Sequence, residues 1–188
     1  DTFKLIEELL VRSKLTDTNR LKEIIAEIRT SMKPDLVSRG HATTAARALS
    51  YISRNNYVKE KAKGIDYYEF IDDLNQNFDE RKQELVTRLQ EVLEEILHKE
   101  NLIISYTGKE NVEEAIGMNV TLFSIYLSTR KQNPVEESWK PVVRNEGFKT
   151  ASQVQYVATA GNYKKQGYEA SGALRVLETI FSYDYLWI

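Results

Sequence analysis

The chain has 188 residues, 41% of them hydrophobic, and 26 Lys and Arg against 28 Asp and Glu give a formal net charge of -2. This balance lacks the basic surplus that neutralises nucleic-acid phosphates, so no nucleic-acid partner is expected. The absence of cysteine excludes a disulfide framework, a thiolate zinc site and a cysteine nucleophile. Without an apolar run of about 18 residues or a signal-peptide pattern, we expect a soluble chain with no membrane partner and an unassigned compartment.

Helical periodicity dominates the first two-thirds of the sequence. Apolar residues recur three and four positions apart over residues 21–32, behind the candidate caps Thr16 and Asp17, and Pro34 is expected to end that helix. Residues 35–53 repeat the spacing with small side chains, which would let a neighbouring backbone approach closely. A long amphipathic helix is predicted over residues 79–96.

The period changes after the long helix. Residues 102–106 form a short apolar run with β-branched side chains, which predicts a buried strand, and residues 112–127 return to helical spacing. Two prolines and no sustained period make residues 129–152 a linker candidate. Residues 153–159 are strand-like and residues 172–186 helical. The predicted fold class is therefore α+β and helix-dominated.

The elements suggest parts of two domains. Residues 1–128 are interpreted as the helix-rich end of one α+β domain, residues 129–152 as the linker, and residues 153–188 as the truncated start of a second domain. The final apolar side chains, Tyr185 to Ile188, need partners, so we expect the polypeptide to continue beyond this segment. A strand without a sheet can also pair with a second copy, which leaves a homodimer open.

The sequence contains few candidates for metal ligands or catalytic groups. Zinc hydrolases usually place two histidines one helical turn apart beside a carboxylate, whereas His41 and His98 are isolated from each other. We interpret His41 as a packing or capping residue near Gly40, and His98 as a side chain favoured at a helix C-terminus. No G-x-S-x-G string is present. We predict no catalytic, cofactor-binding or metal-binding residue.

The segment from Asp73 to Glu84 has oxygen-bearing side chains at several calcium-ligand positions of an EF-hand loop. Its sixth position is Phe78, where that loop needs glycine for a sharp turn. Arg81 and Lys82 would also oppose a dication. A helix C-terminus, an Asn-rich turn and an N-cap at Asp79 explain this segment better than a calcium site does.

Two stretches carry a family resemblance. The first contains Gly40-His41, the string from Arg47 to Ser50, and the string from Gly64 to Tyr68. It resembles the third domain of presequence-protease-like members of the insulinase (pitrilysin) family. The second stretch, residues 148–188, resembles the opening of the fourth domain of the same enzymes, and the similarity extends over nearly the whole chain.

This resemblance implies part of a zinc endopeptidase built from about four α+β domains, whose two halves close over unfolded peptides. The family's H-x-x-E-H zinc motif has no counterpart here, and its substrate-contacting arginine and tyrosine would be expected beyond Ile188. The implied role is non-catalytic: chamber wall and substrate-facing scaffold. The implied partners are the remainder of the parent peptidase and its peptide substrate, and zinc belongs to the parent.

Two alternatives remain open. The chain could be a helical protein-interaction module, for which the long helix of residues 79–98 would provide a surface. It could also belong to a family member that has lost catalysis and acts as a partner subunit.

Overall fold

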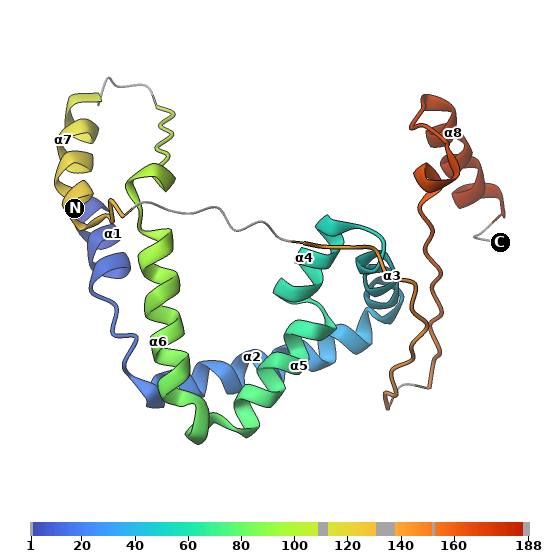
Figure 1. Cartoon of the computed structure of the whole chain (residues 1–188), viewed down its shortest axis with the longest axis horizontal. Coiled ribbons are helices and arrows are strands. Elements are labelled where there is room, and N and C mark those ends of the chain that lie inside the picture. Colours follow the sequence, from blue (N-terminus) through green and yellow to red (C-terminus); the bar gives the residue numbers. More distant parts are fainter. Residues whose placement is uncertain (1, 109–112, 131–137, 152, 186–188) are drawn as a thin grey trace. The chain divides into compact units, whose positions relative to one another are not determined.

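The computed structural model describes the chain apart from residues 1, 109–112, 131–137, 152 and 186–188. Helices dominate the described residues, as predicted (Figure 1). The α-helices are α1 (Thr2–Val11), α2 (Thr18–Ser38), α3 (Gly40–Ser50), α4 (Arg54–Lys63), α5 (Ile65–Gln76), α6 (Phe78–Ile96), α7 (Glu113–Phe123) and α8 (Gly172–Ile180). Short 3-10 turns and one π-helical turn are η1 (Lys99–Asn101), η2 (Ser124–Tyr126), η3 (Tyr163–Gln166) and η4 (Phe181–Tyr185).

The chain forms two compact units. The first unit contains Asp1–Lys33 with Tyr68–Ser138, and the second contains Pro34–Tyr67 with Trp139–Ile188. No described helix combines the length and apolar content that crossing a membrane requires.

The first unit holds an apolar core. Its buried hydrophobic side chains are Ile25, Ile71, Leu74, Phe78, Val86 and Leu127. They come from α2, α5 and α6 and from the turn after α7. The apolar stripe expected for α6 is not its buried face, because Val92 and Ile96 are 54% and 61% exposed whereas Val86 is buried. At the rim, Lys22 of α2 forms an ion pair with Asp79 of α6 at 2.8 Å.

The second unit contains α3 and α4, joined by a tight connection (Figure 1). Ser53 begins α4 as its N-cap, because its hydroxyl accepts from the backbone N–H of Asn56. Ser171 caps α8 in the same way. Gly167 ends η3 with a φ of 85°, a left-handed conformation that favours glycine.

The prediction that Pro34 ends its helix was wrong. Pro34 lies inside α2, which continues to Ser38. Proline removes one helical N–H donor, but the following turn is closed by the backbone bond from Arg39 to Asp35 at 3.1 Å and by their side-chain ion pair. The expected helix over residues 35–53 is consequently divided between the end of α2 and the separate helix α3.

The two predicted strands are not found. Residues 102–106 and 153–159 are neither helical nor paired as strands, and the strand-like pairing among the described residues is one parallel bridge between His98 and Ser128. A strand exists through hydrogen bonds to a neighbour, and apolar alternation alone cannot supply that neighbour. The structure therefore confirms the helix-dominated part of the predicted fold class.

Candidate functional site

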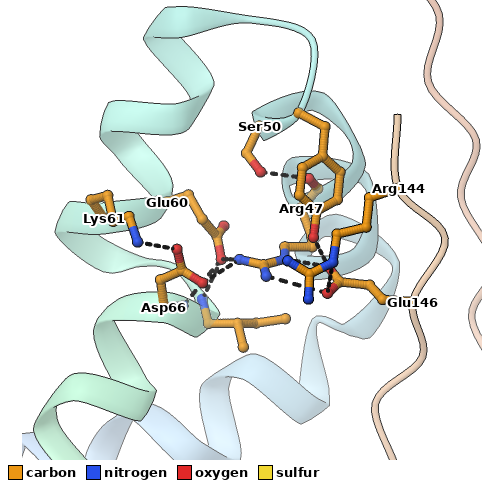
Figure 2. A network of polar contacts seen from close by, with 9 residues as sticks. Arg47, Ser50, Glu60, Lys61, Asp66, Arg144 and Glu146 are labelled. Carbon is orange, nitrogen blue, oxygen red and sulfur yellow. Dashed lines mark hydrogen bonds and ion pairs between the residues drawn. The ribbon is translucent and has the colours of Figure 1, made fainter. Parts of the chain in front are cut away.

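The most developed polar site of the second unit surrounds Arg47 in α3. This residue is only 9% exposed, although arginine is rarely buried without partners. Three carboxylates face it: Glu60 from α4, Asp66 from α5 and Glu146 from the segment after residue 138 (Figure 2). We call Arg47, Glu60 and Asp66 together the Arg47 joint, and we call Glu146 the outer partner of this joint.

The guanidinium uses different nitrogens for the two sides. Its Nη1 atom donates to Glu60 at 2.9 Å and to Asp66 at 2.5 Å. Its Nε and Nη2 atoms donate to the two oxygens of Glu146 at 2.5 and 3.3 Å, which is a bidentate arrangement. Lysine offers a single ammonium and cannot reproduce this fork, so the residue type is tied to the geometry.

Glu60 connects Arg47 to the beginning of α5. Its side chain is 4% exposed, and the oxygen that accepts from Arg47 also accepts from the backbone N–H groups of Ile65 and Asp66 at 2.8 and 3.2 Å. These N–H groups have no partner within the helix, so the carboxylate caps α5 and complements its dipole. The Glu60 side chain reaches α5 past Gly64, and this position requires a small residue because an added Cβ would lie 2.2 Å from Glu60 Oε2.

Glu146 is held from both sides. The hydroxyl of Tyr51, the C-cap residue of α3, donates to it, and Arg144 lies 3.6 Å away. The backbone N–H of Val142 donates to the carbonyl of Tyr51 at 2.8 Å, so residues 142–146 are attached to α3 at two places. Figure 2 shows Arg144 and Glu146 together beside Arg47.

The surroundings of the site shift the pKa values of Asp66, Glu146 and Tyr51. For Asp66, burial opposes ionisation, but hydrogen bonds from Lys61 and Arg47 outweigh it and hold the pKa below the ordinary aspartate value. The hydrogen bond from Arg47 likewise lowers the pKa of Glu146. Burial and the hydrogen bond to Glu146 raise the pKa of Tyr51. Asp66 and Glu146 are therefore ionised at neutral pH, and Tyr51 keeps its proton.

This arrangement is suited to holding elements together. A general acid or base needs a proton affinity matched to neutral pH, whereas Asp66 and Glu146 are shifted away from it. Every buried side-chain N or O atom in the part of the chain that the structure describes has a hydrogen-bond partner. The Arg47 joint is a satisfied polar network that fixes α3, α4 and α5.

The two histidines occupy different settings. His41 is exposed on α3, with its ring 6.1 Å from that of Tyr156. His98 is 4% exposed: its Nδ1 accepts from the backbone N–H of Glu100, so its Nε2 is the nitrogen that donates to the carbonyl of Arg130. His98 thus ties the end of α6 to the chain after α7, a role beyond the helix C-terminus expected from the sequence.

The calcium-like segment is a junction between helices. Residues 73–76 end α5, Asn77 separates the helices, and the buried Phe78 begins α6. No group of three or more His, Cys, Asp or Glu able to hold a metal ion occurs among the described residues. The prediction that this chain provides no metal ligand stays a prediction.

Comparison with known proteins identifies the family. Residues 1–74 match the protein-family model for a region associated with peptidases of family M16, subfamily C. The alignment with presequence protease 1, chloroplastic/mitochondrial, of Arabidopsis thaliana covers 100% of the chain at 29% identity. These matches support an insulinase-family segment. Protein HypA of Clostridium perfringens is 34% identical over 98% of the chain, and an uncharacterized protein of Borreliella burgdorferi is 31% identical over 54%.

The insulinase-family segment spans 19% of the clostridial protein and 17% of the Arabidopsis protein. Two of the strings that carry the resemblance contribute to the Arg47 joint: Arg47 comes from the string of residues 47–50, and Asp66 comes from the string of residues 64–68. Glu60 and Glu146 were not singled out from the sequence. A glutamate four residues before a glycine was a local signal for Glu60, whereas Glu146 lies 99 residues from Arg47 and gave none.

Proposed function

We propose that this chain is a non-catalytic segment of a zinc metalloendopeptidase that degrades peptides in a closed chamber, and that it contributes chamber wall and substrate-facing scaffold. The carrying observation is that essentially the whole chain aligns with less than a fifth of two relatives, one of them named as a protease. The proposed partners are the remainder of that peptidase and its peptide substrate.

The burial pattern supports a role within a larger protein. The described buried hydrophobic residues all belong to the first unit, whereas the described buried residues of the second are Gly40, Arg47, Ser50 and Glu60. Apolar burial is the main favourable term in folding, and a unit held chiefly by polar bonds gains little of it. Residues of the parent would supply the missing apolar partners for helices such as α8, where Val176 is 60% exposed.

The domain assignment belongs to the same proposal. Residues 1–128 would end one insulinase-type α+β domain, residues 129–152 would be the linker, and residues 153–188 would open the next. The segments 102–106 and 153–159 would become strands on pairing with sheets of the parent, because an extended apolar segment needs an adjacent edge.

Zinc would be held elsewhere in the parent. The described residues do not fit a zinc site: His98 uses both ring nitrogens in hydrogen bonds, and no carboxylate group clusters with either histidine as a ligand set. This segment would therefore position and enclose rather than activate water.

An antibody against the chain tests the proposal. It should capture a polypeptide on the order of five times longer than 188 residues, as the 19% share of the clostridial relative implies, with chelator-sensitive peptidase activity. The purified chain alone should cleave no peptide and retain no zinc after dialysis. Capture of a short polypeptide, or chelator-sensitive cleavage by the chain alone, would overturn the proposal.

The exposed apolar residues of α6 favour a second candidate, a helical protein-interaction module. Val92 and Ile96 are 54% and 61% exposed on this long helix. The antibody experiment separates the candidates: a long captured polypeptide without peptidase activity indicates an inactive partner subunit, and a short one indicates the module.

A further inference from the structure

Residues 141–150, a part of the linker candidate, are attached to the end of α3 by few of their side chains. Residues 141–150 are all exposed, and Val143 is 96% exposed, so this segment buries little apolar surface. Its attachments include the Val142 to Tyr51 backbone bond, the Phe148 ring 5.6 Å from the Arg47 guanidinium, and the Glu146 side chain, which is 18% exposed. The polar anchor at Glu146 is its main attachment.

The charges around the anchor divide evenly. Arg47 and Lys61 face Glu60 and Asp66 within the helices, while Arg144 and Glu146 both belong to the extended segment. If the segment moves away, it takes one cation and one carboxylate with it. The helices then keep two cations with two carboxylates, so neither part is left with an unpaired charge.

We propose that residues 142–148 form a detachable strap, which leaves α3 when the Arg47–Glu146 pair opens while the Arg47 joint between α3, α4 and α5 stays closed. The two halves of the guanidinium make this separation possible. Nη1 holds Glu60 and Asp66, and the Nε and Nη2 edge alone holds the strap.

Acidification opens the strap. The groups that face Glu146 are Arg47 of α3, Tyr51 at the C-cap of α3, and Arg144 of its own segment. Glu60, Lys61 and Asp66 complete the network around the guanidinium. Because Arg47 holds the pKa of Glu146 below its ordinary value, the strap stays docked at neutral pH. Its attachment weakens only as the pH falls through that lowered pKa, where Glu146 loses its charge.

The experiment is residue-resolved amide hydrogen exchange on the 188-residue chain and its Glu146→Gln variant. The Val142 amide reports on the strap, and the Ile65 and Asp66 amides, which donate to Glu60, report on the joint. Losing a charge-assisted hydrogen bond should accelerate exchange at Val142 about tenfold or more, while the joint amides change less than about twofold. The exposed Glu169→Gln is the matched control and should change neither.

A second readout does not depend on slow exchange. Because the chain has no cysteine, Val143→Cys accepts a single nitroxide label on the exposed side of the strap. The label should become more mobile in the Glu146→Gln background at neutral pH, and in the otherwise unchanged chain only on acidification. Equal acceleration at the strap and the joint would show that they open together, and no change at either the Val142 amide or the label would show that Glu146 does not fasten the strap.

Discussion

Arg47→Met separates the contribution of the Arg47 joint from that of the surrounding helices. Methionine keeps an unbranched chain with high helix propensity, so the change removes the guanidinium without disturbing α3 itself. It leaves the carboxylate of Glu60 buried, at 4% exposure, without its cation. The effect therefore measures an unpaired buried charge.

The expected cost follows from the partners that remain. Removing one partner of a buried ion pair costs about 3 to 5 kcal/mol. Here Glu60 keeps two backbone N–H donors, Asp66 keeps Lys61 at 2.6 Å, and Glu146 keeps its bond from the tyrosine hydroxyl. We therefore expect the low end, about 3 kcal/mol, which corresponds to roughly a hundredfold faster exchange of amides that open with the second unit.

Amide exchange within α4 is the assay, because the two compact units need not unfold together. The Gly64 amide, bonded to the Glu60 carbonyl at 2.9 Å, is a suitable reporter. The control Arg39→Met removes an exposed pair and should cost at most about 1 kcal/mol. Adding Glu60→Gln to Arg47→Met should recover part of the loss, because the neutral amide retains an oxygen for α5. A cost equal to the control, or no recovery in the double variant, would refute the reasoning.

Three further outcomes are expected. Gly64→Ala should destabilise the second unit by about 1 to 3 kcal/mol, measured by α4 amide exchange, because the new Cβ displaces the buried Glu60 carboxylate. His98→Ala should cost about 1 to 3 kcal/mol in the first unit, with faster exchange at the Ser128 amide, because the Arg130 carbonyl loses its donor. The third outcome concerns pH, and the same amide exchange measures it. Asp66 and Glu146 have lower pKa values in the folded chain than in the unfolded chain, where they lie at about 4. Their contribution to stability is therefore present above the unfolded pKa values and is lost as the pH falls through the folded ones.

Local patterns predicted what local forces determine. The spacing over residues 79–96 located α6, but the helix begins at Phe78 with Asn77 as its N-cap, so the expected N-cap at Asp79 was wrong. The Pro34 prediction failed because neighbouring interactions offset one missing donor. The strands failed because pairing depends on a partner that apolar alternation cannot specify.

The contacts of the Arg47 joint could not be predicted from the sequence, because they too join residues that are distant along the chain. Its carboxylates and their outer partner lie 13, 19 and 99 residues along the chain from Arg47, and no periodic pattern connects such positions. The strings that resemble the insulinase family did mark the arginine and Gly64, but they gave no indication of what those residues contact.

The contrast between the units explains why a family segment would retain a buried charge network. Apolar burial stabilises the first unit without strong directionality, whereas a guanidinium whose Nη1 atom donates to both Glu60 and Asp66 fixes the relative placement of three helices. Buried ion pairs add little net stability compared with apolar packing, so such a network specifies geometry more than it stabilises. If this chain is part of a chamber wall, the rest of the parent protein would cover its exposed apolar surface. Apolar contacts with the parent would then supply stability, and the Arg47 joint would keep α3, α4 and α5 aligned.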